Sequence, residues 1–172
     1  LYEEAVRLNM TVAVHIANGN PNMVNVLRTA EDPGSAFGIF RIPTVAACHA
    51  LMMSPIPSKF PELRWGFIEA SAGWVPWVIT EARNRYQGAG RKFPGNVMKE
   101  YNIYVTCQTD DDIPYILQCA GEDNIVIGTD YGHFDPSSEV DAISVLREQG
   151  TLSESALTKI LRDNPKAMYG LS

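Results

Sequence analysis

The sequence predicts an α/β fold in which helices cover a parallel β-sheet. Short, almost continuously apolar runs, which are typical of strands buried on both faces, alternate with longer amphipathic segments. This alternation occurs four times, and no internal repeat, low-complexity tract or long linker interrupts it. An open doubly wound sheet and a segment of a (β/α)8 barrel both fit the pattern.

Four runs are predicted to be strands because they are short, rich in β-branched and aromatic residues, and bounded by turn-forming residues. They are residues 11–16 (TVAVHI), 63–70 (LRWGFIEA), 102–108 (NIYVTCQ) and 124–130 (NIVIGTD). We expect their apolar side chains to form the core of one domain that spans residues 1–172.

The segments between these runs are predicted helices because apolar residues recur at helical spacing and the ends carry capping signals. The predicted helices cover residues 2–9, 43–54, 73–86, 110–121, 136–150 and the segment from Ser153 to a C-terminal turn. Three aspartates at 110–112 suit the positive end of a helix dipole, Ser153 is the predicted N-cap of the last helix, and Gly121 and Gly150 are predicted helix ends. A loop rich in Asn, Gly and Pro is expected over residues 17–42.

Composition excludes several classes of protein. The chain has 172 residues, 45% of them hydrophobic and 20% charged, which is typical of a globular domain. A net charge of −6 argues against a nucleic-acid partner, and no run approaches the roughly 18 apolar residues of a membrane span. The three cysteines show no CxxC spacing, and no signal-peptide pattern is present. We therefore expect a cytoplasmic protein that binds neither nucleic acid nor membrane.

Polar and ionisable residues follow the predicted strands, and in parallel α/β folds the functional groups gather at these carboxyl ends. In chain order they are His15; Glu69 and Ser71; Thr106, Cys107 and Gln108; and Asp130, His133 and Asp135. Imidazole and carboxylate groups are the usual ligands of zinc and similar cations in catalytic sites. A glycine-rich phosphate loop and a G-x-S-x-G nucleophile elbow are both missing from the sequence.

Each of these residues also has a purely structural interpretation. His15 fits a half-buried histidine whose hydrogen bonds are satisfied, and Glu69 fits a cap of the helix that follows it. Asp130 fits a turn residue that bonds its own backbone, and His133 fits an ordinary loop residue. We interpret His49, in the middle of a predicted helix, as structural. Spacing alone does not choose between these interpretations.

Three segments carry a resemblance to a known family: FPELRWGFIEASAGWVPWVI, NIVIGTDYGHFDP and ILRDNPKAMYGL. In this order they resemble the C-terminal half of the amidohydrolase-related, metal-dependent TIM-barrel enzymes. The branch in question includes aminocarboxymuconate-semialdehyde decarboxylase and resorcylate-type decarboxylases. The resemblance implies strands 5–8 of a (β/α)8 barrel, with the half that carries strands 1–4 not present in this chain.

The resemblance also implies roles for individual residues. His15 would be the metal ligand of strand 5, and Asp130 would be the ligand and proton carrier of strand 8. Glu69 occupies the place where many relatives carry a histidine on strand 6, and EASAGWVP resembles a subgroup with E-S-G-x-G-W-x-P. Glu69, Asp130 and His133 are the predicted catalytic residues. Trp74, Arg41 and Tyr131 are the predicted substrate contacts.

The predicted function is that of a metal-dependent hydrolase that acts on a small organic acid, ester or lactone. Its cofactor would be a divalent metal, zinc in the first place, with manganese or another ion as the alternative. Non-oxidative decarboxylation uses the same groups, so it remains an alternative, as does a non-catalytic half-barrel. Since a half-barrel exposes two strand edges, we expect a homo-oligomer or association with an N-terminal half.

Overall fold

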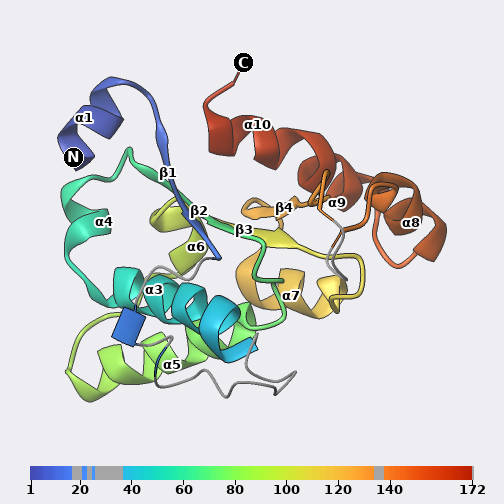
Figure 1. The fold of residues 1–172 in the computed structure, drawn as a ribbon. Helices are drawn as coiled ribbons and strands as arrows, with labels where there is room; N and C mark the ends of the chain where they lie inside the picture. The colour runs from blue at the N-terminus through green and yellow to red at the C-terminus, as the bar shows by residue number, and fades with distance from the viewer. Residues whose placement is uncertain (17–20, 23–24, 26–36, 134–137, 172) are drawn as a thin grey trace.

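A four-stranded parallel sheet forms the centre of the protein (Figure 1). The computed structural model describes residues 1–16, 21–22, 25, 37–133 and 138–171. The strands are β1 (Thr11–His15), β2 (Arg64–Ile68), β3 (Ile103–Cys107) and β4 (Ile125–Ile127). They lie in the order β1-β2-β3-β4, so neighbours in the sheet are also consecutive in the sequence. The predicted α/β fold with a parallel sheet is confirmed.

Helices fill the connections between these strands. In chain order the described helical segments are α1 (Tyr2–Arg7), the π-helix η1 (Phe37–Arg41), α3 (Ile42–Met53), α4 (Ile56–Lys59), α5 (Val75–Gly88), α6 (Val97–Glu100), α7 (Ile113–Ala120), α8 (Ala142–Gln149), α9 (Glu154–Thr158), the π-helix η2 (Lys159–Asp163) and α10 (Asn164–Tyr169). Within the described ranges, none of them has the length and apolar character that crossing a membrane requires.

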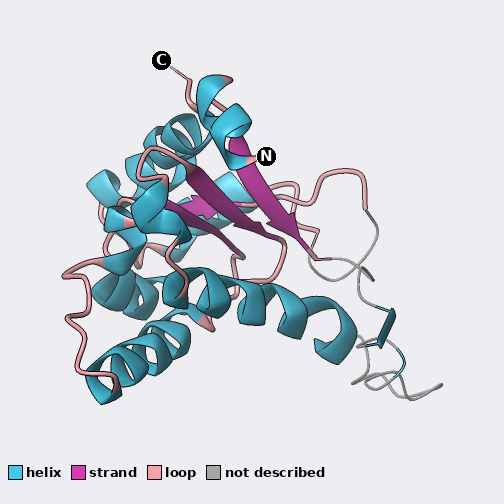
Figure 2. Cartoon of the chain, turned by 90° about the vertical axis from the view of Figure 1, so that its left-hand side faces the viewer, coloured by secondary structure: helices cyan, strands magenta, loops and turns pink. Residues whose placement is uncertain are grey.

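The two faces of the sheet are covered by different helices, and the turned view of Figure 2 shows helices on both sides of the strands. Phe67 and Val105 belong to the large core shared with α3, α5 and α7. The residues next to them along the strands point the other way, because side chains alternate across a sheet. On that second face Tyr104 and Val126 pack against Met168 of α10. This second face leads to the polar groups at the strand ends.

Several helix ends follow the predicted signals. The side chain of Ser153 accepts a hydrogen bond from the Ala156 amide, as expected of an N-cap. Gly121 ends α7 with φ of 81°, and Gly150 ends α8 in a left-handed conformation with φ of 62°. Glycine adopts such positive φ values without steric cost. Of the three consecutive aspartates, only Asp112 caps α7, by accepting from the Tyr115 amide.

Other elements differ from the prediction. Of the predicted 17–42 loop, the structure describes residues 21–22, 25 and 37–42. Residues 37–42 are helical and not a loop, because η1 precedes the helix that was expected from residue 43. The short helix α6 was not predicted; Asn96 caps it by accepting from the Lys99 amide. Pro165 lies in the first turn of α10, where proline is tolerated, so a further helix forms in place of the expected terminal turn. Asp135 lies outside the described residues.

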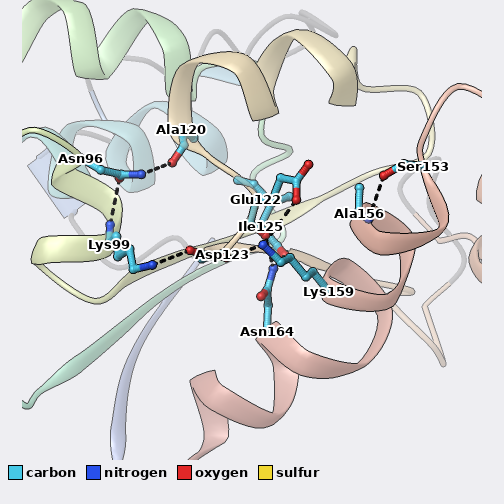
Figure 3. Close-up of polar contacts among 10 residues, drawn as sticks. All are labelled: Asn96, Lys99, Ala120, Glu122, Asp123, Ile125, Ser153, Ala156, Lys159 and Asn164. Carbon is cyan, nitrogen blue, oxygen red and sulfur yellow. Dashed lines mark hydrogen bonds and ion pairs between the residues drawn. The ribbon is translucent and has the colours of Figure 1, made fainter.

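The C-terminal helices are tied to the start of β4 by a polar network (Figure 3). The buried Asn164 donates through Nδ2 to the carbonyl groups of Glu122 and Ile125, both at 2.7 Å. Lys159 contacts Asp123 at 2.7 Å, and Lys99 reaches the other oxygen of Asp123 at 2.7 Å. These contacts fix the entry to β4, the strand that leads to Asp130.

Candidate metal centre at the strand ends

The polar residues predicted at the strand ends meet because the strands are in register. His15, the last residue of β1, pairs with the last residue of β2, and the last residue of β3 pairs with that of β4. Glu69 follows β2 immediately, and Asp130 lies three residues beyond β4. One edge of the sheet therefore gathers side chains from segments that are far apart in the sequence.

Two carboxylate–imidazole pairs lie at this edge. Nε2 of His15 is 2.7 Å from Oε2 of Glu69, and Nδ1 of His133 is 2.7 Å from Oδ1 of Asp130. The carboxylates are nearly buried, with side-chain exposures of 10% for Glu69 and 11% for Asp130, whereas the imidazoles are 52% and 61% exposed. In each pair a shielded acid orients a histidine that solvent can reach.

The His15 ring is fixed from its other side as well. Its Nδ1 lies 2.7 Å from the Ile16 carbonyl oxygen and can only donate there, so Nε2 is the atom that faces Glu69. A neutral Nε2 and a carboxylate oxygen would both present lone pairs, which repel at 2.7 Å. A proton or a metal ion is needed between them. A histidine that donates one ring N–H to a carbonyl is the usual arrangement of a metal ligand.

The backbone at these positions is strained. Glu69 has φ of 67°, Ser71 has 61° and Asp130 has 48°. The left-handed conformation costs residues with a Cβ roughly 1–2 kcal/mol. It persists where neighbouring contacts fix it, and such residues cluster at functional sites. The Glu69 amide donates to Oγ1 of Thr106 at 2.8 Å, and the Asp130 carbonyl accepts from Ser138 Oγ at 3.2 Å.

A cavity of about 110 Å³ opens between the strand ends. It is lined by His15, Ile68, Glu69, Thr106, Cys107, Gln108, Gly128 and Asp130. Gly128 lies against the side chain of Thr106 in this lining, where a Cβ would make a contact of 3.4 Å. A larger cavity of about 240 Å³ lies between α3 and α5; its polar lining is His49, Glu81 and Arg85, with one imidazole and one carboxylate in place of the two pairs at the strand ends.

The residues at the strand ends fit a divalent cation. Glu69, Asp130 and His133 each offer a ligand atom, and these atoms lie within 4.8 Å of one another. Two atoms about 2.1 Å from one ion are at most about 4.2 Å apart, so small side-chain rotations bring all three to one ion. Oδ2 of Asp130 is buried and has no hydrogen-bond partner within the described part of the chain. A buried carboxylate oxygen without a partner is costly, and a cation would satisfy it.

The structural interpretation of Glu69 as a helix cap does not match these contacts. The N-terminus of α5 has no side-chain cap at Trp74, and the amides just before it donate to Asp111. Asp130 bonds His133 through its side chain, and its own turn is closed by backbone groups. His15 and Asp130 were the predicted metal ligands. The structure places Asp130 with Glu69 and His133, and His15 joins this group through Glu69.

The predicted substrate contacts lie at different distances from the cavity. Nη2 of Arg41 is 3.4 Å from Oε1 of Gln108, so Arg41 lies at the rim. Tyr131 is exposed next to Asp130. Trp74 is absent from the lining; its ring packs edge-on against Phe67, and its indole N–H donates to the Ala70 carbonyl at 3.2 Å. The substrate-binding roles of all three stay predictions.

Asp111 was underestimated from the sequence, whereas Cys107 is buried at the end of β3. Asp111 was assigned to a helix dipole, yet its carboxylate reaches the loop that carries Glu69. No sequence signal separates it from Asp110 and Asp112. Burial raises the pKa of the Cys107 thiol to about 12, and the nearby charge of Asp111 adds to the effect. Cys107 is therefore a neutral part of the cavity wall at neutral pH, not a nucleophile.

Comparisons with known proteins give a family and similar folds. The model of a family described as amidohydrolase matches residues 1–171. No curated protein matches the chain. Similar solved structures are an amidohydrolase from Mycobacterium avium subsp. paratuberculosis K-10 (20% identity, TM-score 0.76), 5-carboxyvanillate decarboxylase from Sphingomonas paucimobilis (14%, 0.73), and a dihydroxybenzoic acid decarboxylase from Polaromonas sp. JS666 (19%, 0.67). The last contains bound manganese and the inhibitor 2-nitroresorcinol.

These three alignments cover 99%, 99% and 98% of this chain but only 44%, 52% and 52% of the solved chains. The chain thus spans about half the length of the structures that it matches. At such identities the likeness shows the fold, and the predicted partial TIM-barrel fold is confirmed. Because the family model matches nearly all of the sequence, this chain belongs to the amidohydrolase family.

Proposed function

We propose that the protein is a divalent-metal-dependent enzyme that hydrolyses a small organic acid, ester or lactone. One observation carries this proposal: a buried oxygen of Asp130 lacks a partner among the described residues and lies where Glu69 and His133 also present ligand atoms. Such an oxygen is expensive in an apolar core unless a cation binds it. A site of this kind is difficult to explain as packing.

Asp130 and Glu69, together with His15, would hold the ion. Their oxygen and nitrogen atoms suit zinc or manganese. Manganese gains support from the Polaromonas decarboxylase, which contains it. When bound, the ion supplies Lewis acidity that polarises a carbonyl group and lowers the pKa of water. The Ile16 carbonyl keeps the His15 ring turned toward Glu69.

His133 is suited to move the proton. Asp130 accepts the Nδ1 proton of His133 at 2.7 Å, which leaves Nε2 as the basic atom of an imidazole that is 61% exposed. Its ligand atom also lies within 4.8 Å of those of Glu69 and Asp130. We propose that this base takes the proton of a water molecule that enters the site; general-base catalysis of this type contributes roughly 10²–10⁴-fold.

The substrate is proposed to be a small acid. The cavity between the strand ends, about 110 Å³, is smaller than the roughly 300–1,000 Å³ of drug-sized sites. Arg41 lies at its rim beside Gln108 and is placed to pair with a substrate carboxylate. Tyr131, exposed beside Asp130, is proposed to flank the same entrance.

Non-oxidative decarboxylation is the second candidate. It is favoured by two of the similar structures, which are decarboxylases of carboxylated aromatic rings. The same ion and the same proton carrier would serve it. β1 and β4 are the outer strands of the sheet in the described part of the chain. Since this chain spans about half of those structures, we further propose that a second half-barrel or a second copy covers these two strands and completes the site.

Asp130→Asn in the full-length protein tests the proposal. The substitution keeps the size of the side chain but removes the charge, so hydrolysis of a lactone and ester panel should fall by about 10³-fold or more. Asp141→Asn, an exposed carboxylate just before α8, is the matched control and should keep full activity. A parallel panel of hydroxylated benzoic acids separates decarboxylation from hydrolysis. Turnover of Asp130→Asn at the level of the control would contradict the proposal and favour a non-catalytic half-barrel.

A further inference from the structure

The loop that carries Glu69 needs an external support. Glu69 and Ser71 both adopt left-handed backbone conformations, with φ of 67° and 61°. Neither is a glycine, asparagine or aspartate, the residues that tolerate this conformation best. Two such residues within three positions do not form a stable loop by local preference, so contacts from elsewhere in the chain must fix them.

That support comes from Asp111, in the connection between β3 and α7. Its Oδ1 accepts hydrogen bonds from the hydroxyl of Ser71 and from the Gly73 amide at 3.0 Å. Its Oδ2 accepts from the Ala72 amide at 2.9 Å and from the Gln108 amide at 2.8 Å. One carboxylate thus joins two loops: Oδ1 bonds only the loop after β2, whereas Oδ2 bonds that loop and the Gln108 amide at the end of β3. Bonds to an ionised acceptor are the stronger kind.

The Asp111 carboxylate lies close to the backbone of the loop after β2. A Cβ at Gly73 would lie 3.3 Å from Oδ1 of Asp111, so glycine allows the carboxylate to sit against the backbone. Thr106, at the end of β3, accepts from the Glu69 amide at 2.8 Å. The β3 end therefore holds the loop at two places, with Thr106 at its first residue and Asp111 at the next turn.

Asp111 itself is not among the residues that line the cavity in the described part of the chain. What it fixes is the backbone that orients Glu69, whose carboxylate lies 2.7 Å from His15 and near Asp130 and His133. A carboxylate outside the cavity that holds a loop in a strained form is poorly explained by stability alone. Its effect falls on one side chain of the site.

We propose that Asp111 is a positioning residue: it clamps the loop after β2 so that Glu69 presents its carboxylate to the metal site. This inference rests on the proposed function of Glu69 in binding a cation, and it adds a residue that contacts neither the ion nor the substrate. Partners that orient ligands in this way affect metal affinity by roughly 10–100-fold when they are mutated.

Asp111→Asn tests the clamp, and Asp112→Asn is its matched control. Each Asp111 oxygen accepts two donors, so whichever way the amide of Asn turns, its NH₂ group faces two donors. Asp112 caps α7, and asparagine caps helices equally well, so the same substitution one residue later should be harmless. Titration with Mn²⁺ should give a Kd at least 10-fold higher in Asp111→Asn and within about twofold of wild type in Asp112→Asn.

The combination with Glu69→Gln distinguishes positioning from general stability. If Asp111 acts through Glu69, Asp111→Asn should weaken Mn²⁺ binding no further in the Glu69→Gln background. A further 10-fold loss in that background would overturn the proposal, as would equal affinities of Asp111→Asn and Asp112→Asn. Ser71→Ala removes one donor only and should show a smaller effect in the same direction, so it serves if Asp111→Asn does not fold.

Hydrogen exchange separates failure of the clamp from failure of the proposed function. The amides of Ala72 and Gly73 should exchange faster in Asp111→Asn, or in Ser71→Ala, than in Asp112→Asn. Unchanged exchange would show that the clamp does not exist. A second outcome is faster exchange in Asp111→Asn together with a wild-type Mn²⁺ affinity of Glu69→Gln. It would show that the clamp exists but that Glu69 does not bind the metal. The proposed function of Glu69 and the inference built on it would then both be wrong.

Discussion

Asn164 gives a quantitative test of how the C-terminal helices support the strand that leads to Asp130. Its side chain is buried, and its Nδ2 group donates two hydrogen bonds of 2.7 Å, to the carbonyl groups of Glu122 and Ile125 (Figure 3). Replacing Asn164 with alanine removes both donors and leaves two carbonyl groups near the start of β4 without this partner. We expect Asn164→Ala to destabilise the protein substantially while changing no residue of the candidate site.

The magnitude follows from these two bonds. A typical hydrogen bond contributes about 1 kcal/mol net, and an unsatisfied buried group costs about 1–3 kcal/mol. Partial access of water to the Glu122 carbonyl reduces the sum, so we expect a loss of about 2–4 kcal/mol in the free energy of unfolding. For a chain of this size that corresponds to a fall in Tm of roughly 5–15 °C.

Thermal and urea unfolding, followed by circular dichroism, measure this loss. Asn84→Ala is the control, since Asn84 is exposed in the middle of α5 and alanine is the better helix former there. It should leave stability unchanged or raise it slightly. A loss below about 0.5 kcal/mol in Asn164→Ala would refute the reasoning, because the two bonds could not then be satisfied as the structure places them.

Two further predictions concern ionisable groups. Hydrogen bonds from Lys159 and Lys99 hold the pKa of Asp123 below its ordinary value of 3.8. An acid whose pKa is lower in the folded than in the unfolded protein stabilises the fold at pH values above the unfolded pKa. This stabilisation is lost as the pH falls through the folded pKa. Asp123→Asn should therefore cost about 0.5–1 kcal/mol in urea unfolding at pH 7 and progressively less as the pH falls below 3.8; a cost that does not change with pH would contradict the network. Among the three cysteines, Cys48 and Cys107 are buried, and burial raises the pKa of both thiols, whereas Cys119 is exposed. A chromogenic disulfide reagent at pH 8 should therefore modify Cys119 alone in the folded protein and all three in urea. Fast reaction of a second thiol would argue against the packing of α3, which carries Cys48, or of β3, which carries Cys107.

The fold could be predicted from the sequence because its signals are local. Continuous apolar runs such as NIVIG and capping residues such as Ser153 mark elements that the structure contains. The helix α6 escaped prediction because a four-residue helix has too few positions to show a period; Asn96 at its N-cap was the available signal. Pro165 was misleading, since proline is compatible both with the end of one helix and with the first turn of the next.

The candidate site was predictable to the extent that it depends on strand ends. Glu69, Asp130 and His133 were all named from their positions after apolar runs, and the parallel register explains why they meet. The contacts that set the orientation of these side chains could not be predicted from the sequence, because they join residues that are far apart along the chain. Asp111 and Ser71 are 40 positions apart, and nothing in a run of three aspartates shows that only one of them reaches across to another loop.

The most direct test of a metal site built on Asp130 is the metal content of the full-length protein. The protein would be purified without added metal and analysed by elemental mass spectrometry beside Asp130→Asn. We predict about one divalent ion per chain, manganese or zinc, in the wild type and a small fraction of that in the variant, because the buried Oδ2 atom of Asp130 would lose the charge that binds the ion. Equal metal content in the two proteins, or none in the wild type even after addition of Mn²⁺ and Zn²⁺, would contradict it.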